Sequence, residues 1–190
     1  MKKTLVTAIS LLGALVLGTG RASAQPPLSV KTNAAYWATV TPNLALEIGL
    51  SRRLTLELGG GYNPSANNDR SIEHFIVQPE LRWWFNQAFA GTFVGVHIHG
   101  GKFDLYGFGP LTMIKENRLD GWLAGAGISI GRHWLLGSRW GVEAEIGAGF
   151  ATMRYDKYPL PVGEAVMGER YKNNYIGPTR INLSLVYYIW

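Results

Sequence analysis

Two histidines separated by a single residue, His97 and His99, are the side chains of this sequence best suited to chemistry. On an extended strand they share one face and lie about 7 Å apart. Such a pair can ligate a metal or supply a general base, and a base here would activate Ser129 or Ser184 as the nucleophile of a lipid-modifying hydrolase. No third ligand or base-orienting group stands at a recognisable spacing. We therefore expect polar filling at these positions, with no catalytic residue, metal or cofactor.

A second set of candidates consists of seven charged residues that occupy the polar positions of alternating segments. They are Glu47, Glu57, Glu80, Arg82, Glu143, Glu145 and Arg180. If those segments close into a small barrel, the seven side chains face a lumen that side chains just fill, where charges must pair. We expect a salt-bridged plug rather than an ion path. Because acids outnumber bases, we also expect Lys31, His97 or His99 to contribute, or a carboxyl to stay protonated.

The elements that position these residues are predicted to be strands, because apolar residues alternate with polar or small ones along most of the chain. Leu44, Leu46, Ile48 and Leu50, for example, alternate with Glu47 and glycine. Eight segments show this period: Val30–Thr39, Asn43–Ser51, Arg53–Tyr62, His74–Phe85, Thr92–Lys102, Gly121–Gly131, Trp140–Tyr155 and Thr179–Trp190. The prediction is an all-β, eight-stranded antiparallel up-and-down transmembrane β-barrel.

Connection lengths and aromatic residues favour a membrane barrel over a soluble one. Connections near Ser51–Arg53, Asn86–Gly91 and His133–Arg139 are short, whereas Asn63–Ser71, Asp104–Asp120 and Asp156–Asn174 are long. Aromatics cluster near strand ends, as in interfacial girdles. The girdle is predicted to contain Trp37, Trp83, Trp122, Trp134, Trp140 and Trp190, and we expect Trp84, Phe93, Phe103, Tyr155 and Tyr188 at the same two levels. The long loops are suited either to partner contacts or to a solvated rim.

The first 24 residues read as a cleaved secretory signal, with Lys2 and Lys3 before an apolar run and Ala22-Ser23-Ala24 at its end. The predicted domain is then residues 25–190. Removal of the signal leaves 15 basic and 13 acidic residues, scattered along the chain, which argues against nucleic-acid binding. The absence of cysteine excludes disulfides, thiol catalysis and cysteine-ligated metals.

Several short strings carry a family resemblance. They are Lys31-Thr-Asn-Ala-Ala-Tyr-Trp-Ala-Thr39, Gly61-Tyr-Asn-Pro64, Gln78-Pro-Glu-Leu-Arg-Trp-Trp84, Tyr155-Asp-Lys-Tyr158 and Tyr175-Ile-Gly-Pro-Thr179. In these strings the chain resembles a domain-of-unknown-function family of small outer-membrane β-barrels from anaerobic gut and oral Gram-negative bacteria. It is more distantly similar to OmpA-type membrane domains. The resemblance implies a fold and a location but no activity.

Together these patterns favour a non-enzymatic outer-membrane barrel with a plugged lumen, serving envelope integrity or surface interaction. Two alternatives remain open: a barrel enzyme acting on outer-membrane lipid, and a soluble periplasmic barrel that binds a small ligand. The expected partners are the outer-membrane bilayer, lipopolysaccharide and, during biogenesis, the barrel-assembly machinery. The sequence identifies no external partner.

Overall fold

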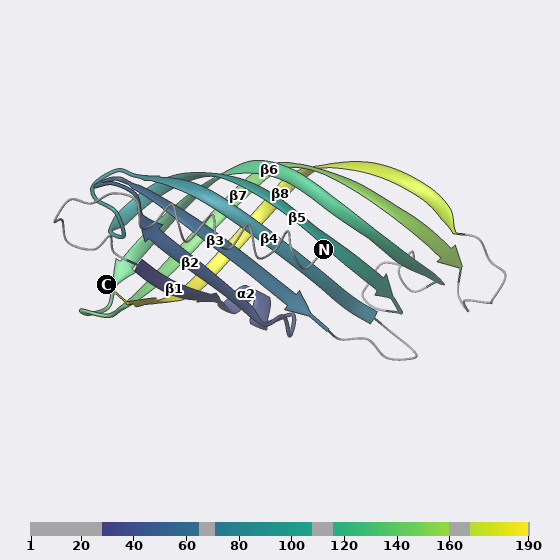
Figure 1. Cartoon of the computed structure of the whole chain (residues 1–190), viewed down its shortest axis with the longest axis horizontal. Coiled ribbons are helices and arrows are strands. Elements are labelled where there is room, and N and C mark those ends of the chain that lie inside the picture. The colour runs from purple at the N-terminus through teal and green to yellow at the C-terminus, as the bar shows by residue number, and fades with distance from the viewer. Residues whose placement is uncertain (1–27, 65–70, 108–115, 160–167, 190) are drawn as a thin grey trace, which may run out of the picture.

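The computed structural model describes residues 28–64, 71–107, 116–159 and 168–189. Within them the chain forms eight antiparallel strands and one short helix. The elements are β1 (Leu28–Asn33), α2 (Ala34–Trp37), β2 (Asn43–Gly49), β3 (Leu54–Asn63), β4 (Ser71–Trp84), β5 (Gly91–Tyr106), β6 (Asn117–Leu135), β7 (Trp140–Pro159) and β8 (Glu169–Tyr188). Each strand pairs with the next, and β1 pairs with β8, so the sheet closes into a barrel (Figure 1). The predicted all-β, eight-stranded up-and-down architecture is confirmed. The proposed signal segment and Trp190 lie outside the described residues.

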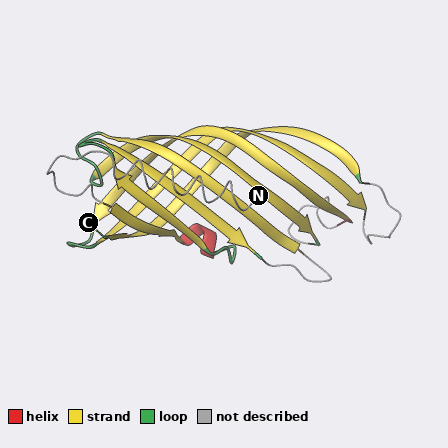
Figure 2. Ribbon diagram, viewed as in Figure 1, coloured by secondary structure: helices red, strands yellow, loops and turns green. Residues whose placement is uncertain are grey.

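The barrel is much taller on one side than on the other. Strands β1 and β2 have 6 and 7 residues, whereas β7 and β8 have 20 each, and the long strands project together beyond the short ones (Figure 2). The predicted extents of the two longest loops are therefore wrong, because much of Asp104–Asp120 and Asp156–Asn174 belongs to β5–β8. The ladder continues there through polar pairs such as Asp120 opposite Asp156, which gave no hydrophobic alternation to detect.

The first strand is also shorter than the predicted segment Val30–Thr39. It ends at Asn33, whose side chain accepts a hydrogen bond from the Ala35 backbone N–H (2.9 Å) and so caps α2. The same side chain donates to the Ile181 carbonyl (3.0 Å) and accepts from the Leu183 N–H (3.1 Å). One asparagine amide thus extends the β1–β8 seam and starts a helical turn.

Two prolines interrupt the ladders in different ways. Pro79 stays in register opposite Leu58 on β3. On its other side the β4–β5 pairing is interrupted between Val77 and Glu80, as expected for a residue that has no N–H to donate. Between β7 and β8 the register shifts after Gly147, next to Pro178. The shift leaves Thr179 as an extra residue in β8, a β-bulge.

The distribution of side chains is inverted relative to a soluble protein. Apolar residues such as Val96, Ile128, Ile146 and Ile181 are 60–68% exposed on the outer face. The buried set is instead dominated by polar and charged groups. Within the part of the chain that the structure describes, no helix is long and apolar enough to cross a membrane, which says nothing about crossing with strands.

The aromatic residues divide between the two faces. Trp37, Trp83, Trp122, Trp134 and Trp140 are 39–53% exposed. Our girdle expectation is wrong for Trp84, Phe93, Tyr155 and Tyr188, which are buried, and for Phe103, whose ring lies 6.4 Å from that of Tyr155. Trp84 follows Arg82 by two residues, and residues two apart on a strand point to the same face, which is the inward one here.

Candidate functional site

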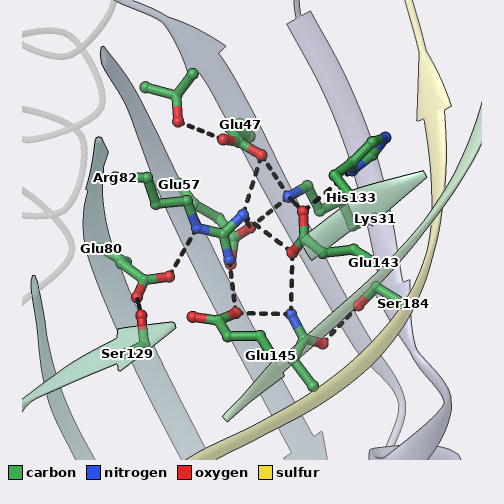
Figure 3. A network of polar contacts seen from close by, with 12 residues as sticks. Lys31, Glu47, Glu57, Glu80, Arg82, Ser129, His133, Glu143, Glu145 and Ser184 are labelled. Carbon is green, nitrogen blue, oxygen red and sulfur yellow. Dashed lines mark hydrogen bonds and ion pairs between the residues drawn. The ribbon is translucent and has the colours of Figure 1, made fainter. Parts of the chain in front are cut away.

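The candidate site is a network of charges that fills the middle of the lumen (Figure 3). Its carboxylates come from β2, β3, β4 and β7, and its cations come from β1, β4 and β8. The seven residues named from the sequence are all inside, between 0 and 8% exposed: Glu47, Glu57, Glu80, Arg82, Glu143, Glu145 and Arg180. Alternation places them there, because every second residue of a closed barrel points to the lumen.

Arg82 is the hub of this network. Its Nη1 lies 2.7 Å from a Glu57 oxygen, 3.0 Å from Glu143 and 3.2 Å from Glu47. Its Nε is 2.8 Å from Glu80, and its Nη2 is 2.8 Å from Glu145. One guanidinium therefore contacts five carboxylates from four strands, a role that its planar set of five N–H donors permits and an ammonium group does not.

Lys31 and Arg180 complete the set of cations. Lys31 Nζ lies 2.9 Å from Glu57 and 2.8 Å from Glu143 and also contacts Glu47. Arg180 pairs with Glu57 and Glu145, the second at 2.9 Å. Hydroxyl and amide groups that the sequence did not assign to the plug supply further donors, among them Thr55 to Glu47, Ser129 to Glu80 and Asn182 to Glu145.

The charge count of the plug is uneven. Among the described residues, five buried carboxylates face three buried cations, so the plug carries a formal charge of −2 when its histidines are neutral. Two histidines lie against carboxylates: His133 Nδ1 is 3.3 Å from Glu143, and His97 Nδ1 is 3.8 Å from Glu80. Protonation of both would bring the plug to neutrality. Lys31 and His97, which we expected to contribute positive charge, are thus in place to do so.

The short-turn end of the lumen is closed by an aromatic floor that the sequence analysis missed. Trp84 packs against Phe93 (4.7 Å between ring centroids) and Phe89 (6.0 Å), and Tyr188 lies 5.7 Å from Phe89. Phe89 belongs to the turn after β4, where its positive φ of 64° directs the ring inward. Phe93 also lies under the Arg82 guanidinium, 4.5 Å from ring centroid to Cζ. The floor therefore lies inside the barrel directly below the charged plug.

The two candidate catalytic histidines lie above the plug. His97 and His99 are buried, with ring centroids 5.8 Å apart, and His97 Nε2 shares a 2.9 Å hydrogen bond with the hydroxyl of Thr179. Neither forms a hydrogen bond with the two serines named from the sequence: Ser129 donates to Glu80, and Ser184 donates to Asn182. Among the described residues, no three His, Asp or Glu side chains are grouped so as to hold a metal ion. The Thr179 bulge thus brings a hydroxyl to Nε2 of His97, whose Nδ1 lies 3.8 Å from Glu80.

Comparisons with known proteins assign a family but no activity. A family model described as "Protein of unknown function (DUF3575)" matches residues 9–189, nearly the whole chain. No curated protein matches the sequence.

Proposed function

Because the chain belongs to the DUF3575 family, whose function is unknown, we propose a function from the barrel itself. The protein is an integral outer-membrane β-barrel that residues 1–24 direct to export. It acts without catalysis, in envelope integrity or surface interaction. Its lumen is sealed, and its partners are the bilayer and lipopolysaccharide. The observation that carries this proposal is the inverted barrel: charges buried inside and aliphatic side chains exposed outside.

The outer face has the dimensions that a bilayer requires. On β6, Trp134 and Trp122 both face outward. Arg132 lies beside Trp134, with its Cζ 5.9 Å from the Trp134 ring centroid, and Ile130, Ile128, Ala126 and Ala124 lie between Arg132 and Trp122. Twelve residues at about 3.3 Å each, tilted by about 40°, correspond to a height of roughly 30 Å, close to the apolar band and its aromatic girdles in outer-membrane barrels. A surface of exposed Ile and Leu of this size is unfavourable in water and favourable in lipid.

Charges begin where this band ends on the long-strand side. One row of paired outward positions holds Lys102, Trp122, Arg154 and Lys172, with the Arg154 Cζ 5.6 Å from the Trp122 ring centroid. The row is positioned to contact lipid phosphates, which supports lipopolysaccharide as a partner. The next row outward is largely acidic and holds Glu73, Asp104, Asp120, Asp156 and Arg170.

The sealed lumen supports a structural role rather than a pore. Arg82 bridges carboxylates of four strands, and Trp84, Phe93 and Phe89 close the end beneath it. An ion would have to separate these groups, and each broken buried pair costs several kcal/mol. We therefore expect no measurable conductance across planar bilayers.

Expression of the full chain in a Gram-negative host tests the location. The expected result is recovery in the outer-membrane fraction, resistance to carbonate extraction, and a gel migration that changes on boiling. A matched variant lacking residues 1–24 should remain in the cytoplasm. Release of the full chain by carbonate, or recovery in the soluble periplasm, would contradict the proposal.

A further inference from the structure

Above His99 the inner face of the barrel changes from polar to apolar and encloses a cavity of about 370 Å³. We call it the outer cup and define it by Ile76, Phe103, Leu119, Leu123, Met153 and Tyr155. Its volume lies within the range of about 300–1,000 Å³ that small-molecule sites occupy. Of these residues, Ile76, Leu123, Met153 and Tyr155 lie within the predicted strands, whereas Phe103 and Leu119 lie in parts of β5 and β6 that extend beyond them.

The outer cup is deep and narrow. Leu123 and Leu119 mark its two ends on β6, four residues apart, which corresponds to about 13 Å along the strand. The interior of an eight-stranded barrel is wide enough either for side chains or for one small ligand, so an elongated ligand would lie along the axis. This length suits an extended hydrocarbon chain.

The walls of the outer cup are held in place. The hydroxyl of Tyr155 accepts a hydrogen bond of 2.9 Å from Asn173 Nδ2, and its ring stacks on Tyr171 with 5.7 Å between centroids. Tyr155 is 8% exposed and Leu119 is 4% exposed. Such pre-ordered walls lower the entropic cost of binding.

Charge fixes the orientation of an occupant. Below the outer cup lies the plug, where carboxylates outnumber cations, so an anionic group is disfavoured at that end. At the rim stands Lys157, paired across the ladder with Leu119 and therefore on the inner face, its Nζ 5.9 Å from the Tyr171 ring centroid. Among the described residues Lys157 forms no ion pair; Glu169, opposite it on β8, instead accepts a hydrogen bond from the Tyr171 hydroxyl, which leaves the Lys157 ammonium for a ligand.

We propose that the outer cup binds a single-chain anionic amphiphile of the fatty-acid class. The hydrocarbon chain lies along the barrel axis between Phe103, Leu123 and Met153, and the carboxylate pairs with Lys157 at the rim. Burial of the chain supplies the affinity, and the rim cation selects the charged head.

Binding can be measured with 11-(dansylamino)undecanoic acid and the full mature chain in lipid nanodiscs, against empty nanodiscs. The expected result is saturable fluorescence enhancement that dodecanoate reverses. Met153→Trp fills the outer cup and should weaken probe binding at least tenfold. Phe150→Trp, on the outward face of the same strand, should not change it. Leu123→Phe is a milder filling variant, and the heat-dependent gel shift verifies folding of each protein.

The head group is tested with Lys157→Gln. This variant should weaken dodecanoate about tenfold and leave dodecanol unchanged, because only the acid pairs with the cation. Lys172→Gln removes the same charge from the outer face and should leave both ligands unaffected. Absence of saturable binding above empty nanodiscs, equal binding by folded filling variants and wild type, or equal loss of acid and alcohol in Lys157→Gln would overturn the proposal.

Discussion

Replacement of Arg82 by methionine is the most informative perturbation of the plug. The methionine keeps much of the side-chain volume but leaves Lys31 and Arg180 as the remaining buried cations against five carboxylates, and the formal charge of the plug changes from −2 to −3. Breaking a buried ion pair by removal of one partner costs about 3–5 kcal/mol. We expect a loss in this range, a large fraction of the 5–15 kcal/mol that typical domains possess.

The assay is urea-induced unfolding of the purified barrel in lipid vesicles, followed by the fluorescence of its seven tryptophans. Arg132→Met is the matched control, because Arg132 is exposed on the outer face. It should change the free energy of unfolding by less than about 0.5 kcal/mol. Arg82→Lys should fall between wild type and Arg82→Met, because it keeps the charge but not the planar set of donors.

A double variant separates electrostatics from packing. Glu145→Gln removes a carboxylate that Arg82 contacts at 2.8 Å and whose Oε1 has no hydrogen-bond partner. Combined with Arg82→Met it restores the plug to −2, so the pair should lose about 1–2 kcal/mol less than the sum of the single losses. If the losses of unfolding free energy in the two single variants simply added up, or if Arg82→Met lost less than about 0.5 kcal/mol, Arg82 would not be the hub of the network.

Two further predictions concern close packing in the lumen. Gly95→Ala should be destabilising, because an added Cβ would overlap the Glu80 carboxylate and the Ser129 hydroxyl. Gly137→Ala should be neutral, because a Cβ there meets nothing within 4 Å. Equal midpoints of the two variants in urea would count against this reasoning. Phe89→Ala should cost about 3–5 kcal/mol by opening the aromatic floor, whereas Phe85→Ala, 47% exposed on the outside, should cost far less when measured in the same way. A Phe89→Ala protein as stable as wild type would show that the floor does not contribute to stability.

The sequence predicted the strand count, the up-and-down order and the inward positions of the seven charged residues, because period-2 alternation sets all three. Strand length was underestimated for β5–β8, since both faces become polar or mixed near Asp104 and Asp156 and the alternation disappears. Part of the outer cup was missed for the same reason, since Phe103 and Leu119 lie beyond the predicted strands. Leu119 points to the same side of β6 as Leu123 and Ser129, so a longer predicted strand would have placed it inside.

Other features depend on contacts that no local pattern encodes. The hub role of Arg82 requires the closed barrel, which brings Glu47 and Glu145 to one guanidinium from opposite ends of the sequence. The inward ring of Phe89 depends on a turn with positive φ. The helical turn α2 has only four residues and no periodicity, and it depends on the Asn33 cap.

The proposed outer-membrane location requires that the aliphatic outer face lies in lipid. Because the sequence contains no cysteine, one fluorophore can be attached at Ile128→Cys, a position 68% exposed in mid-strand, or at Arg170→Cys, near the long-strand end. In vesicles with brominated acyl chains, we expect strong quenching of the label's fluorescence at position 128 and little at position 170. Equal accessibility of both labels to an aqueous quencher, with no quenching by brominated lipid at position 128, would contradict it.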